Sequence, residues 1–312
     1  MYKFAIKNSK TEYNGGNMIS IVITSFNEPE NVKKAIHAIL NNNIKEKYEL
    51  LVVAPDEATE KVVKEFKKKN KQIVYFKDPG KGKSFALNLV FKILKGNIWI
   101  FTDGDVYVGD NSINEIIRLF ENEEVGCVSG RPVSINPKDN MLGFWSHLLF
   151  DAGAHNIRHE LNNKNSFLEC SGYLFAFRND ITKNIPLNVA EDSMIPYLAT
   201  KKGYKVRYAE NAFVYVKNPA NIRDFVNQKV RTAKSHEALG DYAPFFPKVK
   251  SLKNEIKKGT LAALAYPKNI RETFWTGILF AVRLYTWFLV KWEERVLNRR
   301  YSDAWERIES TK

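Results

Sequence analysis

The sequence predicts an α/β protein with a mainly parallel central sheet, flanking helices and a helical C-terminal tail. Two observations carry this prediction. Between residue 19 and about residue 130, short apolar runs of strand length alternate with segments of helical periodicity, which is the rhythm of β-α-β units. Acidic and glycine-containing turns follow several of the apolar runs, at the edge where open α/β sheets bind their ligands.

In the first half, continuous apolar runs such as 19–24 and 97–102 are typical of buried parallel strands. A proline at the first turn opens the helix predicted over 29–40. The strands predicted in this half are 19–24, 48–54, 72–76, 97–102 and 125–130. The helices predicted between them are 29–40, a Lys/Glu-rich segment ending at 70, 82–95 and 111–121.

After Arg131 the alternation loosens. Apolar periodicity predicts helices at 141–161, 190–202 and 222–239, and short strands at 173–177, 204–209 and 213–216. Residues 241–250 contain two prolines and are predicted to be a linker. We therefore predict an N-terminal extension at 1–18, an α/β domain at 19–240 and a helical C-terminal region at 241–312, in a chain of 312 residues.

The net charge of +13 calls for an anionic partner or surface. Basic clusters lie at 61–71 and 248–258, and the first is typical of a solvated helix face. No nucleic-acid-binding motif is present, so nucleic acid is not expected as a partner. Cys127 and Cys170 form neither a zinc spacing nor a disulfide framework, and 1–17 is not a signal peptide pattern. A reducing, cytoplasmic location is expected.

Residues 273–290 form an apolar stretch of eighteen residues that contains Arg283. This length barely spans a bilayer, and a central arginine is costly there. Tryptophans within the stretch and basic residues just beyond it suit a helix lying in a membrane interface. Three alternatives stay open: a helix packed on the domain, a peripheral helix on the cytoplasmic face of a membrane, and a single span.

The predicted strand 97–102 runs directly into Asp103-Gly104-Asp105. Paired carboxylates supply the hard oxygen ligands that Mg²⁺ or Mn²⁺ prefers, and such ions commonly bridge to a substrate phosphate. A solvated turn is the simpler alternative. Neighbouring segments favour the metal site.

Polar groups also follow the other parallel strands. The first strand ends in Thr24-Ser25-Phe26-Asn27-Glu28, and the second ends in Ala54-Pro55-Asp56-Glu57. A glycine/lysine turn containing Lys81 and Lys83 opens the helix predicted at 82–95. Backbone N–H groups and ammonium charges at such a turn suit a diphosphate.

Further motifs follow in the second half: Ser171-Gly172-Tyr173, then Glu191-Asp192, then Gln228-Lys-Val-Arg231-Thr232. In this order the motifs resemble those of the inverting glycosyltransferases of family 2, in the cellulose-synthase-like subgroup. The resemblance covers residues 19 to about 235. It implies the GT-A nucleotide-diphospho-sugar transferase fold and a nucleotide-sugar donor.

The resemblance also implies how the donor is held. In the family, the matching positions line the nucleoside pocket, contact the base, lie near the phosphates, or bind the ribose and the metal. In this chain these positions are Thr24, Ser25 and Glu28 for the nucleoside, Asp56 for a uracil-like base, Lys83 and Lys81 for the phosphates, and Asp103 and Asp105 for the ribose and the Mg²⁺ or Mn²⁺ ion.

For catalysis, the resemblance implies that Asp192 is the general base for the acceptor hydroxyl, with Glu191 as the competing choice. Taken alone, the two acids could simply be favourable charges at a helix N-terminus. Arg231 is expected to stabilise the departing diphosphate. Ser171, Gly172, Tyr173 and Gln228 are expected to contact substrate.

Two departures from the family pattern matter. The usual acid pair after the second strand is here Ala54-Pro55-Asp56-Glu57, so the base contact can differ. The tryptophan expected after Arg231 is Thr232, and one marginal apolar stretch makes no multi-span channel. The missing tryptophan and the single apolar stretch favour single sugar addition over polymer synthesis and export.

The sequence thus predicts a metal-dependent glycosyltransferase that moves a sugar from a nucleotide diphosphate, UDP-linked by resemblance, to a hydroxyl of a glycan or lipid-linked acceptor. The expected partners are this donor, the acceptor and an anionic membrane surface. Two rival functions are a sugar-phosphate nucleotidyltransferase and a non-catalytic module that binds membranes or polyanions. The nucleotidyltransferases usually carry a glycine-rich loop after the first strand, where this chain has Ser25-Phe-Asn-Glu28.

Overall fold

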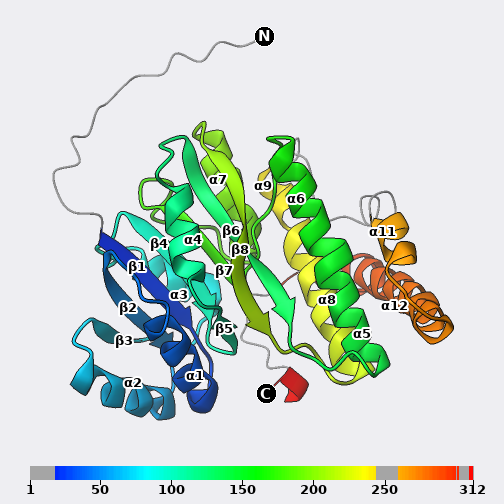
Figure 1. Cartoon of the computed structure of the whole chain (residues 1–312), viewed down its shortest axis with the longest axis horizontal. Helices are drawn as coiled ribbons and strands as arrows, with labels where there is room; N and C mark the ends of the chain where they lie inside the picture. The colour runs from blue at the N-terminus through cyan, green and yellow to red at the C-terminus, as the bar shows by residue number, and fades with distance from the viewer. Residues whose placement is uncertain (1–17, 244–258, 300, 302–308, 312) are drawn as a thin grey trace, which may run out of the picture.

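An eight-stranded sheet forms the centre of the computed structural model, which describes residues 18–243, 259–299, 301 and 309–311 (Figure 1). Residues 1–17 of the extension predicted at 1–18, most of the predicted linker and the basic cluster at 248–258 lie outside the described residues. The strands are β1 Met18–Thr24, β2 Lys47–Ala54, β3 Ile73–Lys77, β4 Ile98–Asp103, β5 Val106–Val108, β6 Val125–Ser134, β7 Leu174–Arg178 and β8 Lys205–Val216.

The strand order is β3-β2-β1-β4-β7-β6-β8-β5. The first four strands pair in parallel, as predicted, and β6 pairs in parallel with β8. The strand β7 is antiparallel to both β4 and β6, and β5 is antiparallel to β8. The α/β prediction with a mainly parallel sheet is therefore confirmed, with a mixed second half.

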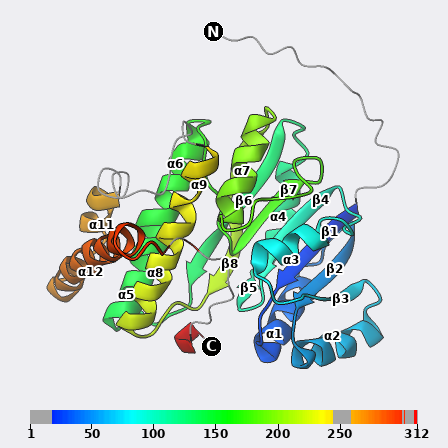
Figure 2. The same cartoon turned by 180° about the vertical axis from the view of Figure 1, so that it is seen from behind.

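Helices cover both faces of this sheet. The helices of the described residues are α1 Pro29–Leu40, α2 Glu57–Lys69, α3 Lys83–Val90, α4 Ser112–Leu119, α5 Met141–Leu148, α6 Asn156–Asn163, α7 Glu191–Lys201, α8 Ile222–Glu237, α9 Leu239–Tyr242, α11 Thr260–Ala265 and α12 Ile270–Arg295. One buried cluster joins the sheet to α1, α2 and α4, and a second joins its other face to α3 and α7. In Figure 2 the helices α3 and α7 lie in front of the sheet.

Three predictions about helices and strands need correction. The two strands predicted at 204–209 and 213–216 form one strand, β8. Residues 210–212 stay extended, because the pairing of β8 with β6 shifts register between Ser129 and Arg131 of β6. The helix predicted over 141–161 contains a π-helical segment, Leu149–His155. The helix predicted over 82–95 ends at Val90.

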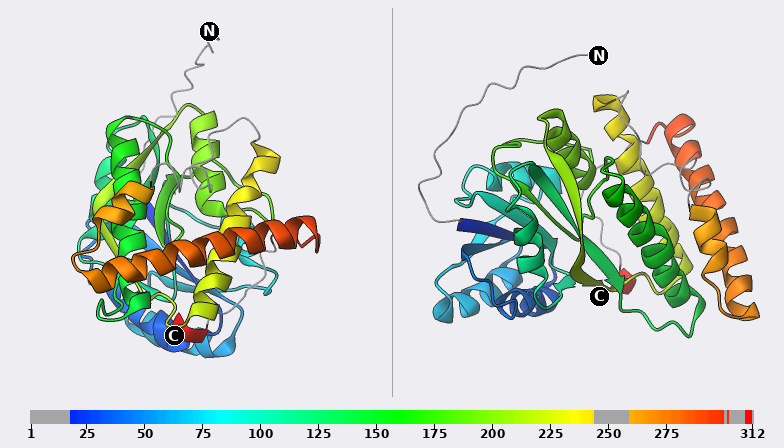
Figure 3. Two further views of the ribbon diagram at one scale, coloured as in Figure 1. Left: turned by 90° about the vertical axis from the view of Figure 1, so that its right-hand side faces the viewer. Right: turned by 45° about the horizontal axis from the view of Figure 1, so that its top comes forward.

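A third buried cluster ties the C-terminal region to the rest of the molecule. It joins α5, α8 and α12, with Trp145, Phe225 and Trp287 among its buried side chains. The indole N–H of Trp145 donates to the carbonyl of Trp275 at 2.7 Å. Figure 3 shows α12 lying across α5 and α8. One face of α12 is therefore packed on the domain, while the boundary predicted at residue 240 stays a prediction.

Candidate active site

The carboxyl ends of β1 and β4 meet at the Asp-Gly-Asp turn. Thr24 pairs directly with Asp103 in the parallel register, and its hydroxyl donates to Asp103 Oδ1 at 2.9 Å. The Gly104 N–H donates to the Thr24 carbonyl at 2.8 Å. A Cβ at Gly104 would lie 2.8 Å from Ser25 Cβ, closer than real Cβ atoms approach. The middle residue of the turn must therefore be glycine for the two strand ends to meet.

Replacing Gly104 by alanine should push the turn away from Ser25. We expect a loss of about 1–3 kcal/mol in the free energy of unfolding, which is the usual cost of overpacking. Urea unfolding would measure this. Gly277→Ala is the matched control, because a Cβ added at Gly277, inside α12, would have nothing within 4 Å. A Gly104→Ala protein as stable as wild type would contradict the close approach.

Lys83, the first residue of α3, joins two of the predicted motifs. Its Nζ lies 2.7 Å from Asp103 Oδ1 and 2.7 Å from Glu191 Oε1. Burial alone would lower the pKa of Lys83, but the charges of these two acids outweigh it and hold the pKa well above its usual value. The structure thus brings the glycine/lysine turn, the Asp-Gly-Asp turn and the Glu-Asp pair into one cluster.

Asp105 lies in a strongly negative electrostatic environment. Burial and the nearby charges of Asp103 and Glu28 raise the pKa of its carboxyl to about 7. A divalent cation would relieve this repulsion, and two carboxylates are suitable hard ligands. No set of three or more His, Cys, Asp and Glu side chains is placed to hold a metal within the described ranges. A cation at Asp103 and Asp105 would therefore take its other ligands from water or a bound phosphate.

The Glu-Asp pair begins α7 and contacts the Ser-Gly-Tyr segment. Asp192 Oδ2 accepts the N–H of Gly172 at 3.2 Å, and the Asp192 carbonyl accepts the N–H of Cys170 at 3.0 Å. Glu191 differs, because one of its oxygens is paired with Lys83. Burial raises the pKa of Glu191, and the charge of Lys83 opposes that rise. The two adjacent acids therefore have different surroundings.

Tyr173 lies near the Asp-Gly-Asp turn, Asp192 and Arg231. Burial, followed by the charges of Asp105 and Asp103, raises its pKa, while the charge of Arg231 acts in the opposite direction. Its ring packs edge-on against Phe150 of the π-helical segment, with centroids 6.1 Å apart. Arg231 of α8 is thus close enough to act electrostatically on Tyr173.

The structure places the other predicted donor contacts around this cluster. Thr24 and Ser25 are both 3% exposed, so little of either residue is open to a ligand. Asp56 caps α2 by accepting the Thr59 N–H at 2.8 Å, and its second oxygen accepts the Asn27 N–H at 3.0 Å. Each Asp56 oxygen keeps a second lone pair for a ligand.

Two further predicted residues lie on helices. Lys81 is exposed, and its Nζ lies 5.5 Å from the centre of the Phe85 ring. Gln228 is half-buried on α8, one turn before Arg231. Sequence reasoning missed Phe150, since nothing in the apolar periodicity marks a π-helical segment. It also missed Asn27, whose left-handed φ of 61° is a conformation that asparagine tolerates.

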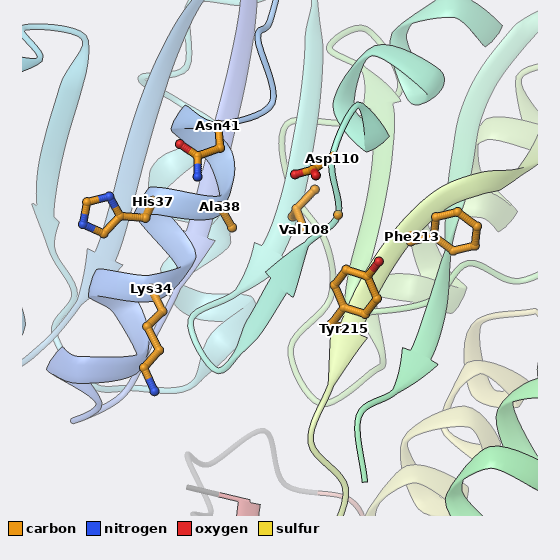
Figure 4. A pocket seen from close by; sticks show the side chains of 9 residues that line it. Lys34, His37, Ala38, Asn41, Val108, Asp110, Phe213 and Tyr215 are labelled. Atoms are coloured by element: carbon orange, nitrogen blue, oxygen red, sulfur yellow. The ribbon is translucent and has the colours of Figure 1, made fainter. Parts of the chain in front are cut away.

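A separate pocket of about 440 Å³ lies between α1 and the strands β5 and β8 (Figure 4). None of the residues that line this pocket belongs to the predicted site. The lining residues are Lys34, His37, Ala38, Asn41, Val108, Gly109, Asp110, Phe213 and Tyr215. The acidic cluster at the ends of β1 and β4 therefore remains the candidate active site.

A mixed α/β sheet with an Asp-Gly-Asp turn after a parallel strand and a second acid pair bridged to it by Lys83 fits a glycosyltransferase of the GT-A fold. The chain belongs to glycosyl transferase family 2, whose model matches residues 20–185. This membership favours glycosyl transfer over both rival functions considered from the sequence.

Curated relatives are similar over much of the chain. It is 24% identical to the poly-β-1,6-N-acetyl-D-glucosamine synthase of Staphylococcus epidermidis, over 90% of this chain and 67% of that protein. It is 23% identical to the hyaluronan synthase of Streptococcus pyogenes, over 50% of this chain and 40% of that protein. The chain thus spans only part of the length of each of these relatives.

Among solved structures, the fold is similar to the mannosyltransferase PcManGT of Pyrobaculum calidifontis, solved in complex with GDP-mannose and Mn²⁺. The TM-score is 0.59 at 15% sequence identity, over 88% of this chain and 83% of that one. At this identity the likeness concerns the fold.

Proposed function

We propose that this glycosyltransferase is inverting and depends on Mg²⁺ or Mn²⁺, and that it moves a sugar from a UDP-linked donor to a hydroxyl of a glycan or lipid-linked acceptor. The observation that carries the proposal is the position of Lys83 between Asp103 and Glu191, 2.7 Å from each. It joins the predicted donor turn to the acid pair that would serve the acceptor. The Mn²⁺ and GDP-mannose in the mannosyltransferase complex support a metal-bound nucleotide sugar.

Asp103 and Asp105 are the residues that would hold the metal, which would neutralise charge on the departing diphosphate as a Lewis acid. Lys83 adds positive charge at the same edge and is well placed to reach the phosphates when a donor loosens its ion pairs. Arg231 would stabilise the diphosphate from the side of α8. Thr24, Ser25, Glu28, Asp56 and Lys81 remain the proposed donor-side residues.

Asp192 is the proposed general base. Its carboxylate would take the proton from the acceptor hydroxyl while the hydroxyl oxygen attacks the anomeric carbon from the face opposite the diphosphate, which inverts the configuration. The competing Glu191 is less suited, because its ion pair with Lys83 occupies one of its two oxygens. Ser171, Gly172, Tyr173 and Gln228 would contact the sugars.

The direct test is a screen of UDP- and GDP-sugars. Each sugar nucleotide would be added with MnCl₂, MgCl₂ or EDTA, and both the thermal unfolding temperature and the release of nucleoside diphosphate would be measured. We expect stabilisation and turnover with at least one UDP-sugar, only in the presence of metal. Turnover that is equal in EDTA would overturn the metal dependence, and a GDP-sugar as best donor would overturn the uridine assignment.

We further propose that the enzyme works as a peripheral protein on the cytoplasmic face of a membrane. By length and composition α12 could cross a bilayer. One face of α12, however, is buried against α5 and α8, and Arg283 lies midway along the helix. The outer faces of α11 and α12 expose large apolar side chains: Leu261, Leu264, Ile270, Phe274, Leu284, Tyr285, Phe288 and Trp292. Exposed apolar side chains flanked by basic residues suit a helix lying on an anionic bilayer rather than a span.

Replacing Phe274 and Phe288 together by glutamate should release the protein from membranes. These rings are 67% and 59% exposed, so the change should leave the core intact. Burying a phenylalanine contributes about 1.5–3 kcal/mol, so we expect binding to fall more than about 10-fold. Co-sedimentation with vesicles of phosphatidylcholine and phosphatidylglycerol would measure it.

Ile93→Glu is the matched control, because Ile93 is 46% exposed and lies beyond α3 on another part of the surface. Its binding to vesicles should equal that of wild type. Unchanged binding of the double phenylalanine variant, or an equal loss in the control, would argue against this surface.

A further inference from the structure

A buried polar contact joins α8 to α7 directly behind the proposed base. The hydroxyl of Ser193, the residue after Asp192, donates to Glu169 Oε2 at 2.9 Å and contacts His236 Nδ1. His236 Nδ1 also lies 3.1 Å from Glu169 Oε2. Ser193, Glu169 and His236 are 0%, 3% and 6% exposed, so none of them can touch a substrate.

The Glu169 end of this contact is anchored to the segment that holds Asp192. Arg158 of α6 donates to the carbonyls of Glu169 and Cys170, at 3.1 Å and 3.3 Å. The next residues of the segment donate backbone N–H groups to Asp192, from Cys170 and Gly172. A shift of Glu169 would therefore carry the hydrogen-bond partners of Asp192 with it.

The His236 end lies on the helix that carries the predicted diphosphate and acceptor contacts. Gln228 and Arg231 precede His236 on α8 by about two turns and one and a half turns, at 3.6 residues per turn. The backbone joins the same two helices, since the Ala190 N–H donates to the Ser235 carbonyl at 3.4 Å. The start of α7 and the last turn of α8 are thus held together at one point.

We infer that His236 is a positioning residue: through Ser193 and Glu169 it sets the position of α8 against the start of α7, so that Arg231 and Asp192 face the same substrate. The inference rests on the proposed function of Asp192 and Arg231. A buried carboxylate and imidazole are costly to desolvate, whereas apolar side chains of the same size would pack at lower cost. Their hydrogen bonds are directional, and that is what positioning requires.

The test compares His236→Ala with His236→Asn, whose amide can take the place of Nδ1. Release of UDP from UDP-N-acetylglucosamine and of GDP from GDP-mannose would be followed with MnCl₂. A misplacement of about 1 Å can cost on the order of 100-fold in rate, so we expect His236→Ala to lower kcat by about 10- to 100-fold with little change in donor KM. His236→Asn should recover most of kcat.

Ser193→Ala and the double variant with His236→Ala complete a double-mutant cycle. If the two residues act as one link, the double variant should be no slower than the slower single variant. His147→Ala is the matched control, because it removes a 2.8 Å histidine contact, to the carbonyl of Asn136, on a different helix, α5. Thermal unfolding of every variant separates loss of fold from loss of position.

Equal kcat for His236→Ala and wild type, or independent and additive effects of the two substitutions, would overturn the positioning role. An equal fall in kcat for His147→Ala at equal loss of stability would also overturn it. Failure of the proposed function is distinguishable, since it would appear as absence of metal-dependent turnover in the wild-type protein itself.

Discussion

Asp192→Asn is expected to lower kcat for sugar transfer by about 10²- to 10⁴-fold, the usual contribution of a general base, while the donor KM changes little. Asparagine keeps the shape of the side chain and can still accept the N–H of Gly172. It cannot take a proton from the acceptor hydroxyl. Release of nucleoside diphosphate at saturating donor measures kcat, and the donor dependence of thermal unfolding measures binding.

Glu191→Gln distinguishes the two acids. Glu191 is 2.7 Å from Lys83, which in turn contacts Asp103, so losing its charge should disturb the donor side. We expect a raised donor KM for Glu191→Gln and a lowered kcat for Asp192→Asn. The reverse pattern, with near-normal kcat in Asp192→Asn, would move the base to Glu191.

The sequence predicted the parallel half of the sheet and the place of the acids because both depend on local patterns. Apolar runs such as 97–102, which became β4, are long enough to indicate buried strands, and parallel strands end at a common edge. Asp103 and Thr24 lie side by side at that edge.

What the sequence could not predict depends on contacts between distant segments. The three-residue strand β5 is too short for any periodicity, and the register shift in β6 appears only when β8 pairs with it. Lys83 bridges two acids that lie far from it in the sequence, and Ser193 contacts the distant His236. No local sequence pattern marks either contact. Each is a result of tertiary packing.

The sequence also could not predict which face of the C-terminal helix α12 is buried. Its apolar stretch was compatible with packing, interfacial binding or a span, because composition does not say which face is covered. Packing of Trp287 and Val290 against α5 and α8 assigns the inner face, and the exposed Phe274 and Phe288 mark the outer one. The prediction of a helix was local; the choice of its buried face was not.

Asp105→Asn is expected to have two opposite effects. Metal-dependent turnover should fall by at least about 100-fold, because preorganised charge at the leaving group is commonly worth several kcal/mol. The metal-free protein should become more stable at pH 8, by about 1–2 kcal/mol, since functional sites commonly hold repulsion that a neutral residue relieves. This figure is below the full pKa shift because Asp105 is only partly buried.

The pH dependence follows from the raised pKa of Asp105, about 7 against an ordinary 3.8. Between these values the native state binds more protons than the unfolded state, so this group lowers the free energy of unfolding of the wild type as the pH rises from about 4 to about 7. Asparagine does not titrate. The stability advantage of Asp105→Asn should therefore be full above pH 7 and should shrink towards pH 4.

Urea unfolding in EDTA at several pH values would measure this advantage, and added MnCl₂ should stabilise the wild type but not the variant. Asp110→Asn is the matched control, because Asp110 is exposed and lies five residues further along the chain. We expect its stability to stay within about 0.5 kcal/mol of wild type, as for most surface changes. If Asp105→Asn were less stable than wild type at pH 8 in EDTA, or still responded to MnCl₂, then Asp105 would be a structural acid rather than the charge that a metal completes.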